Sequence, residues 1–309
     1  MGPGLRNKAS KYKNVREKNA IIYKTDEEIE WIRESCLLVS KTLAQVASAL
    51  KPGVKGQFID ELAETFIRDH GAVPGFKGYH GFPATLCVSV NEVVVHGIPD
   101  KHMEFQDGDI VSVDCGVISN GFYGDAAYTF PVGEVSDEVM ELCRVTNTSL
   151  YQGIDQVRIG NRVGDIGFAI QEYAERQHGY GIVRDLIGHG VGRDLHEAPQ
   201  VPNFGRRGRG VKLQQGLVIA IEPMVNLGNK AVSTARDGWT VFARDRKPAA
   251  HYEHTVALKK EGVDILSNHV WVHEAIEANP DLNAVALYEN ELTDAHWAAQ
   301  KAIALQKAL

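Results

Sequence analysis

The amino-acid sequence predicts an α+β fold built from two similar halves. Two segments with the apolar spacing of helices precede a group of strand-like segments, and this order then occurs a second time. Three features recur at one offset of 108 residues: Gly108 with Gly216, Asp114 with Glu222, and the His-Gly pair at 70–71 with that at 178–179. One coincidence could arise by chance, but three at a single offset indicate an internal duplication.

The first predicted helix begins after Thr25. The stretch Thr25-Asp-Glu-Glu28 has the spacing of a capping box, in which a hydroxyl caps the helix and a carboxylate follows three residues later. Pro52 and Gly53 then end the helix. Its buried face is expected to consist of apolar residues at helical spacing: Ile29, Ile32, Val39, Leu43, Val46 and Leu50.

A second helix is expected over about 57–70, ending at Gly71, with Phe58, Leu62 and Phe66 on its buried face. Strand-like segments follow at 86–95 and 109–114, where β-branched residues or alternation dominate. The second half has predicted helices at about 136–157 and 165–178. Its predicted strands are 217–221, 239–243 and 255–258.

Composition and charge exclude several functional classes. The 309 residues are 44% hydrophobic and 24% charged, as in ordinary globular proteins. A formal net charge of -7 argues against a general nucleic-acid-binding protein. No apolar run approaches the ~18 residues of a membrane-spanning helix, and the basic, polar first twenty residues are unlike a secretory signal. We therefore expect a cytoplasmic protein with no membrane partner and no specific nucleic-acid partner.

The four cysteines are too widely spaced for a paired thiol site. Cys36, Cys87, Cys115 and Cys143 lie at least 28 residues apart, so no CxxC redox or zinc motif is present. Scattered thiols in a long chain are typical of a reducing compartment. Most of them are expected to be small buried hydrophobic residues.

Four acidic residues stand beside apolar strands. Asp114 and Glu222 come directly after apolar strands that the 108-residue offset relates, whereas Asp125 and Glu253 precede such strands. Taken alone, each acid is more often part of a structural salt bridge than a functional group. Four carboxylates that converged without a cation would repel one another and raise their own pKa values. A pair of divalent metal ions would replace that repulsion with coordination.

Three histidines complete the candidate site. The glycine-rich stretch Gly188-His-Gly-Val-Gly192, interpreted as a loop, carries His189, and His196 follows seven residues later. Glycines in such a loop allow the backbone to approach another group closely. His96 comes directly after an apolar strand-like run. One histidine at a strand end is usually structural, but three beside four strand-end acids favour a functional site.

From about residue 25 to residue 258, the chain resembles the type I methionine aminopeptidases, which have the pita-bread fold. The shared motifs occur in family order and spacing. They are Tyr79-His-Gly-Phe-Pro83, Asn91-Glu-Val-Val-Val-His-Gly-Ile-Pro99, Val113-Asp-Cys-Gly116, Tyr123-Gly-Asp125, Gly188-His-Gly-Val-Gly192, His196-Glu197, Ile221-Glu-Pro-Met224 and Tyr252-Glu-His-Thr255. The resemblance implies two pseudo-symmetric α/β halves with an antiparallel sheet, helices outside and a metal site at the centre.

The resemblance also implies a site for two divalent metal ions. Asp125 and Glu253 would bridge both ions, Asp114 would complete the shell of one, and His189 and Glu222 would complete that of the other. The donor set leads to a similar expectation by itself, because four carboxylates and one imidazole suit Mn, Fe or Co better than a thiolate-type zinc centre. The identity of the metal stays open among Co, Mn, Fe and Zn.

The implied reaction is hydrolysis of the first peptide bond of nascent polypeptides that begin with methionine and have a small second residue. An activated water would attack the carbonyl, with Glu222 as general base. His196 would donate a hydrogen bond to the carbonyl oxygen, and His96 would hold the substrate near the scissile amide.

By the same resemblance, the methionine side chain would bind an apolar pocket whose walls include Tyr79, Phe82, Cys87 and Trp239. For Cys87, a place in the hydrophobic core is the alternative, and the sequence does not separate the two. Leu195 stands where the family often has an aromatic residue, a departure that would loosen the site without removing its chemistry.

Two other functions stay open. X-Pro aminopeptidases and dipeptidases of the same fold usually carry an additional N-terminal domain, whereas about 24 residues precede Thr25 here. A non-catalytic peptide-binding or ribosome-binding homologue would be expected to have lost ligands, and all five implied ligands are present. The interval from His189 to Glu222 is also short for the inserted helical subdomain of type II enzymes, which favours type I.

Three regions are expected along the chain. Residues 1–24 form a basic flexible tail, whose first twenty residues contain six lysines and arginines and one acid, Glu17. Residues 25–258 form the catalytic domain. Residues 259–309 form a C-terminal extension of unknown role, with helical spacing over 293–309. The tail motivates a further hypothesis of a transient ribosome contact through residues 8–18, and the protein is expected to be a monomer.

Overall fold

The computed structural model describes residues 20–286, 298–299 and 302. The expected tail over 1–19 lies outside these residues, as does the helix expected over 293–309 apart from 298–299 and 302. Helix α2 (Asp26–Ala49) begins after Thr25, whose side chain accepts a hydrogen bond from the Glu28 N–H. The Glu28 carboxylate in turn accepts one from the Thr25 N–H, which confirms the predicted capping box. The predicted apolar face of this helix is confirmed as buried.

Helix α3 (Gly56–Asp69) has nearly the predicted extent but a different buried face. The prediction that Phe58, Leu62 and Phe66 are buried was wrong: the buried positions are Ile59, Ala63 and Ile67, and Phe58 is 51% exposed. Both sets have i, i+4 spacing and lie one position apart around the helix, so periodicity alone does not separate them. The two isoleucines join the main core, while the Phe66 ring packs beside the ring of His70 with centroids 4.2 Å apart.

The strands of the first half are β1 (Val73–Pro74), β2 (Leu86–Val90), β3 (Val93–Val95), β4 (Ile110–Ser119) and β5 (Phe122–Pro131). β4 pairs antiparallel with β1, β2 and β5. The segment expected as one strand over 86–95 is divided, because Asn91 takes a left-handed conformation (φ 50°). Its side chain there accepts from the Ile110 N–H and donates to Asp109. Pairing with β5 also extends β4 to Ser119, so Asp114 lies inside this strand and not at its end as predicted.

The second half contains α4 (Asp137–Ile154), α5 (Val163–Gln171) and a π-helical turn, η2 (Glu172–Gln177), so the helix predicted over 165–178 consists of two elements. Its antiparallel sheet has the order β15-β14-β9-β7-β8. The bounds are β7 (Gly188–Gly190), β8 (Glu197–Val201), β9 (Val218–Ile221), β14 (His254–Lys259) and β15 (Gly262–Ile265). The loop predicted over 188–192 was therefore wrong for 188–190. Gly188 packs so closely on β9 that a Cβ there would lie 2.3 Å from the Ala220 carbonyl oxygen.

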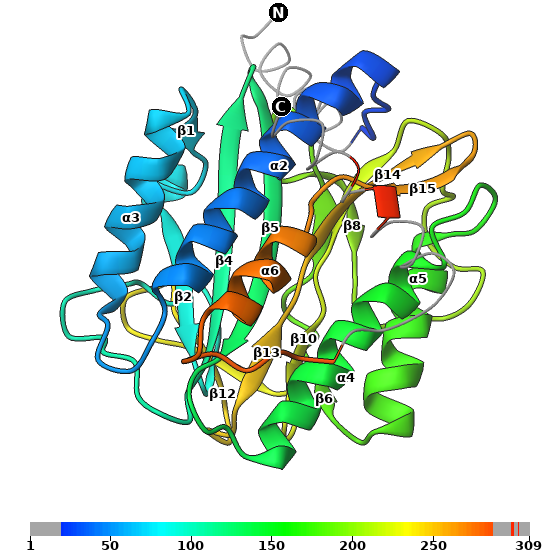
Figure 1. Cartoon of the computed structure of the whole chain (residues 1–309). Helices are drawn as coiled ribbons and strands as arrows, with labels where there is room; N and C mark the ends of the chain where they lie inside the picture. The colour runs from blue at the N-terminus through cyan, green and yellow to red at the C-terminus, as the bar shows by residue number, and fades with distance from the viewer. Residues whose placement is uncertain (1–19, 287–297, 300–301, 303–309) are drawn as a thin grey trace, which may run out of the picture.

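Two small sheets and a last helix complete the described fold. One sheet has the order β13-β10-β6 and the other β11-β12-β3. Their remaining strands are β6 (Gly181–Ile182), β10 (Met224–Asn226), β11 (Val232–Thr234), β12 (Val241–Ala243) and β13 (Ala249–His251). Helix α6 (Val270–Ala278) lies beside α2 over the long strands β4 and β5, with α4 and α5 farther along the same side (Figure 1). Among the described residues, no helix is both long and apolar enough to cross a membrane.

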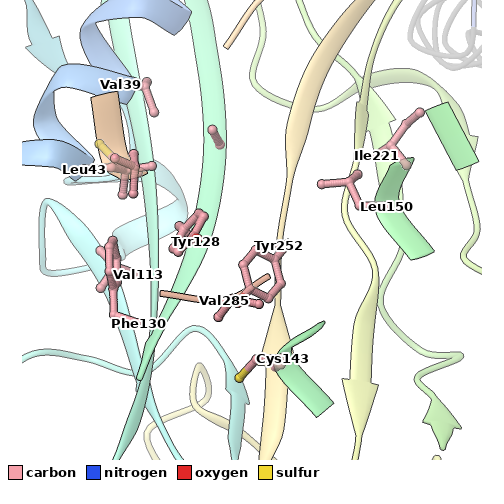
Figure 2. Close-up of a cluster of buried hydrophobic side chains, with 14 of the residues drawn as sticks. Val39, Leu43, Val113, Tyr128, Phe130, Cys143, Leu150, Ile221, Tyr252 and Val285 are labelled. Atoms are coloured by element: carbon pink, nitrogen blue, oxygen red, sulfur yellow. The ribbon is translucent and has the colours of Figure 1, made fainter. Parts of the chain in front are cut away.

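The main core joins the two halves. Figure 2 shows Leu43 of α2 and Tyr128 of β5 on one side, Leu150 of α4 and Ile221 on the other, and Tyr252 between them. The 108-residue offset relates equivalent turns, because Gly108 and Gly216 both have positive φ (93° and 84°) just before β4 and β9. The glycines at 71 and 179 likewise have φ of 72° and 77° after helical segments. All four cysteines are buried and free.

Candidate metal centre

Two carboxylates of the candidate site come from the β4–β5 hairpin. Asp114 pairs with Ala127 across the hairpin, and Asp125 lies two residues before Ala127 on β5. Because side chains two residues apart share a face, Asp114 and Asp125 are diagonal neighbours on one face of the sheet. Asp125 is 3% exposed, and its backbone carbonyl accepts a hydrogen bond of 2.7 Å from Thr255 Oγ1 on β14.

The other two carboxylates come from the second half. Glu222 directly follows β9 and Glu253 directly precedes β14, and these strands pair antiparallel with Ile221 opposite His254. The register therefore places Glu222 and Glu253 opposite each other. The Glu253 N–H donates to the Ala127 carbonyl at 3.0 Å, a bond that links this pair to the β4–β5 hairpin. The structure thus brings together the four acids that the sequence selected.

His189 lies on β7 between these two pairs. Its Nε2 is 3.4 Å from Glu222 Oε1 and 3.7 Å from Asp125 Oδ2. Its Nδ1 is 3.0 Å from the Gly190 carbonyl oxygen, which can only accept, so Nδ1 carries the proton and Nε2 is left with a free lone pair. One potential ligand atom from each of Asp125, His189 and Glu253 lies within 4.8 Å of the other two, a spacing suited to a shared metal ion.

The cluster has no cationic partner among the described residues that line its cavity, because none of them is a lysine or an arginine. One oxygen each of Asp114, Asp125 and Glu253 is buried without a hydrogen-bond partner. Burial raises the pKa of Asp114 to about 7. Burial, reinforced by the neighbouring acids, raises the pKa values of Asp125, Glu222 and Glu253 well above their usual range. Burial lowers the pKa of His189 to about 3, so its imidazole is neutral. Orphaned carboxylate oxygens around a neutral imidazole are a donor set that fits divalent cations.

Two further predicted histidines stand at the rim of the cluster. His196 directly precedes β8, its Nδ1 is 2.7 Å from the Tyr79 hydroxyl, and its ring centroid is 4.3 Å from that of His189. Burial, followed by nearby histidines, lowers the pKa of His196 to about 4. His96 follows β3 in a left-handed conformation (φ 58°), and its ring lies edge-on to Trp239 with centroids 6.4 Å apart. Burial lowers the pKa of His96 as well, so both histidines are neutral near pH 7.

His251 was missed by the sequence reasoning. It is 2% exposed, and its Nε2 lies 3.9 Å from Glu222 Oε2 with no hydrogen-bond partner of its own. Burial lowers its pKa to about 3. The available signal was its position in the sequence, because His251 lies two residues before Glu253 and β13 ends at His251.

An apolar cavity of about 250 Å³ adjoins the acids. Its lining includes the four residues that the resemblance implies for a methionine pocket: Tyr79, Phe82, Cys87 and Trp239. Tyr79 lies on a short 3₁₀ turn, η1 (Tyr79–Gly81), and the rings of Phe82 and Trp239 meet edge to face at 5.2 Å. Cys87 of β2 is the direct cross-strand partner of Asp114 on β4, which places a small apolar side chain beside the acids.

Additional residues line the same cavity without having been predicted. They are Phe76, His80, Val95, Leu186, Ile187 and Met224. Leu195 also lines it and is 2% exposed, so the departure from the family pattern contributes an aliphatic wall.

A family model, metallopeptidase family M24, matches residues 30–260. Methionine aminopeptidase from Clostridium acetobutylicum is 52% identical over 247 residues, which cover 80% of this chain and 98% of that protein. Methionine aminopeptidase 1 from Bacillus subtilis is 47% identical over 247 residues, which cover 80% of this chain and 99% of that protein.

The chain is also similar to solved structures of methionine aminopeptidases. The crystal structure of methionine aminopeptidase from Thermotoga maritima is similar with a TM-score of 0.79 and 43% identity, covering 81% of this chain and all of that one. The prolidase from Pyrococcus furiosus has a TM-score of 0.66 at 22% identity and covers 80% of this chain and 65% of that one, a likeness of fold alone.

Proposed function

This chain belongs to metallopeptidase family M24, and from that membership we propose that it is a metal-dependent aminopeptidase that removes the N-terminal methionine of nascent polypeptides when the second residue is small. The resemblance identified from the motifs is confirmed, as is the α+β fold with two related halves. The relatives at 40–52% identity are named for methionine release, whereas the proline-specific enzymes share about 20–22% identity and the fold. This difference favours methionine over proline as the basis of specificity.

The observation that carries the proposal is a cluster of four carboxylates, two buried and two half-buried, with a neutral imidazole at an apolar cavity. We propose that Asp114, Asp125, His189, Glu222 and Glu253 would hold two divalent ions, with Co, Mn, Fe or Zn as candidates. When bound, such ions supply an acidified water and polarise the substrate carbonyl. The remaining chemistry falls to side chains of this chain.

Glu222 is the proposed general base. Its pKa is raised by burial and by Asp114, so its carboxyl group can take a proton from the attacking water and return it to the leaving amine. A carboxylate that is fully ionised and well solvated would hold that proton poorly. His251 lies 3.9 Å from the other oxygen of Glu222 and limits the positions that this side chain can take.

His196 is the proposed donor to the substrate carbonyl oxygen. Its Nδ1 lies 2.7 Å from the Tyr79 hydroxyl, and a hydroxyl that donates there leaves the proton of the neutral ring on Nε2. Nε2–H is then available to an oxygen on which negative charge develops. His96, also neutral and packed against Trp239, would hold the amide beyond the scissile bond.

The cavity accounts for the proposed selectivity. Its volume of about 250 Å³ and its lining of Tyr79, Phe82, Cys87 and Trp239 suit an unbranched apolar side chain such as methionine. A free α-amine on the first residue would be a further ligand for a divalent ion held by these acids. A chain without a free amine, or with a polar first residue, would lose one of these two contributions.

We propose that residues 25–258 form the catalytic unit, that the protein is a cytoplasmic monomer, and that residues 259–309 are an addition to that unit. Within the addition, β15 pairs with β14 and α6 packs beside α2. A transient ribosome contact by residues 8–18 is supported by their charge. Salt-sensitive co-sedimentation with ribosomes tests it, and equal binding by a chain that lacks residues 1–19 contradicts it.

The decisive experiment measures free methionine released from Met-Ala-Ser, with Ala-Pro-Ser and N-acetyl-Met-Ala-Ser as comparison peptides. Metal-stripped protein is assayed before and after Mn, Co or Fe(II) is added. We expect metal-dependent cleavage of the first peptide alone. Preferred cleavage of the proline peptide would assign the chain to the neighbouring specificity. No cleavage with any metal, from protein shown to be folded, would overturn the proposal in favour of a binding role.

A further inference from the structure

A second groove, of about 860 Å³, opens directly from the metal centre. Ile187, His189 and His196 line both this groove and the apolar cavity, so the two spaces meet beside a proposed metal ligand and the proposed donor to the substrate carbonyl. When the first side chain of a substrate fills the apolar cavity, the rest of the substrate chain needs a route along the surface. The groove provides one that runs along β8.

The far part of the groove combines apolar surface with positive charge. Ile21, Phe204 and the 37% exposed Val211 contribute apolar contacts, and Arg206 and Arg209 line the same groove. The acid that lines it, Glu197, is paired with the buried Lys24 and is therefore already neutralised.

The two arginines are exposed and have no ion-pair partner among the residues that the structure describes. The loop that carries them is held in place by its backbone. Asp165 at the start of α5 accepts a hydrogen bond of 2.8 Å from the Gly208 N–H, and the Arg162 guanidinium donates to the Gly210 carbonyl at 2.8 Å. The charges of Arg206 and Arg209 are thus presented on a fixed loop and are free to meet a ligand.

Arg207, between them, faces a different environment. Its guanidinium stacks over the ring of Phe168 on α5 at 4.5 Å, and it lines a separate hollow with Phe168. The chain therefore contains a matched control, with the same residue type on the same loop but outside the groove.

We infer that this groove binds the part of the substrate chain that follows the scissile bond, and that Arg206 and Arg209 select for acidic side chains a few residues downstream of the N-terminal methionine. The inference rests on the proposed function, because it assumes that a peptide enters with its first residue in the apolar cavity. Charge complementarity supports it, since the unpaired positive charges of this groove would attract a carboxylate and repel a lysine.

The test uses peptides of the form Met-Ala-Ser followed by a neutral Gly/Ser chain, in which Glu, Gln or Lys is placed in turn from the fourth to about the eighth residue. An extended chain advances about 3.3 Å per residue, so this scan moves the charge over roughly 13 Å. We expect kcat/KM to be about three- to tenfold higher for Glu than for Lys at one or two adjacent positions, as for exposed ion pairs. In ~0.5 M NaCl the preference should fall toward one.

Substitutions test which arginines cause the preference for Glu. In R206Q/R209Q the ratio of kcat/KM for the Glu peptide to kcat/KM for the Lys peptide should fall to about one. The ratio should invert in R206E/R209E and stay unchanged in R207Q. Because both peptides are compared with the same variant, a change in the overall activity of that variant does not alter the ratio. Fluorescence anisotropy with peptides whose first amide is replaced by a non-hydrolysable CH₂–NH link provides a binding readout, and we expect the same ordering of affinities.

Cleavage of the all-neutral peptide with no Glu-to-Lys preference at any position would overturn this inference and leave the proposed function standing. Failure to cleave the neutral peptide would count against the proposed function itself. A preference that persists in R206Q/R209Q, or that R207Q removes equally, would also overturn the assignment to this groove.

Discussion

Asp125 is the most informative residue of the metal centre for a substitution test, because acids from both halves of the fold, Asp114 and Glu222, act on its carboxyl group. Burial, Asp114 and Glu222 all raise its pKa, so in the metal-free protein its negative charge opposes folding. We expect Asp125→Asn to raise the melting temperature of the metal-free protein by about 2–5 °C, since ~1 kcal/mol corresponds to about 2–4 °C in a domain of this size. The same variant should lose both the stabilisation by added Mn and the peptidase activity. Thermal unfolding with and without metal measures both effects.

Asp264 on β15 supplies the matched control. Its side chain is 30% exposed and forms ion pairs with Arg33 at 2.5 Å and with Lys259 at 3.0 Å. Burial raises its pKa, but the two cations together outweigh burial, so the pKa of Asp264 is lowered. Asp264→Asn should therefore lower the melting temperature with or without metal. The metal-site assignment fails if Asp125→Asn destabilises the metal-free protein as Asp264→Asn does.

At the scale of elements, the segment before α2 is tied to the loop that carries His196. The Lys24 side chain, 2% exposed, donates to Glu197 Oε2 and at 3.0 Å to the Ile22 carbonyl, and its backbone N–H donates to Gly216 before β9. Residue 24 was expected in the flexible tail, yet this end of the tail packs against the core. Glu197 is the neighbour of His196, so the ion pair anchors the start of β8 beside the proposed catalytic group.

We expect Lys24→Met to cost about 3–5 kcal/mol in the free energy of unfolding, because it leaves Glu197 buried without its partner. The double variant K24M/E197M should recover most of that loss, since apolar residues of similar length avoid the unpaired charge. Urea unfolding of both single variants and the double variant measures the coupling. A loss below ~1 kcal/mol in Lys24→Met would mean that water already screens Glu197.

The elements also show what the sequence could predict and what it could not. Helix α2 was predictable because its capping box and apolar face are local features. The buried face of α3 was not, since two adjacent stripes fit the same period and contacts with the sheet select between them. Asp114 was chosen correctly for the cluster but placed at a strand end, because the length of β4 is set by its pairing with β5. Strands as short as β6 and β13 form only because they pair with β10, so their sequences alone do not predict them. His251, the last residue of β13, was missed for the same reason.

At the scale of the whole molecule, the acid cluster links protonation to the stability of both halves. Asp114 and Asp125 come from the first half, and Glu222 and Glu253 from the second. Their raised pKa values mean that the folded, metal-free protein holds these protons more tightly than the unfolded chain, whose carboxyl pKa values are near 4. That contribution is complete below the unfolded pKa and is lost as the pH rises through the folded pKa. His189 has the opposite shift, and its contribution is constant above about pH 7, where it is neutral in both states.

We therefore expect the metal-free protein to become less stable between pH 7 and pH 8. Asp114 titrates at about pH 7, and burial with the neighbouring acids raises the pKa values of the other three carboxyl groups well above their usual range. The folded state therefore releases protons in this interval that the unfolded state has already lost. Each such proton corresponds to about 1.4 kcal/mol per pH unit, or roughly 3–6 °C in melting temperature. Bound metal competes with these protons, so the rise in melting temperature on adding Mn should be larger at pH 8 than at pH 7. Thermal unfolding of EDTA-stripped protein across this interval, with Asp125→Asn as a comparison of shallower slope, measures both trends. A metal-free melting temperature that stays constant or rises from pH 7 to pH 8 would show that the carboxylates are already ionised without metal and would contradict the electrostatic account of the site.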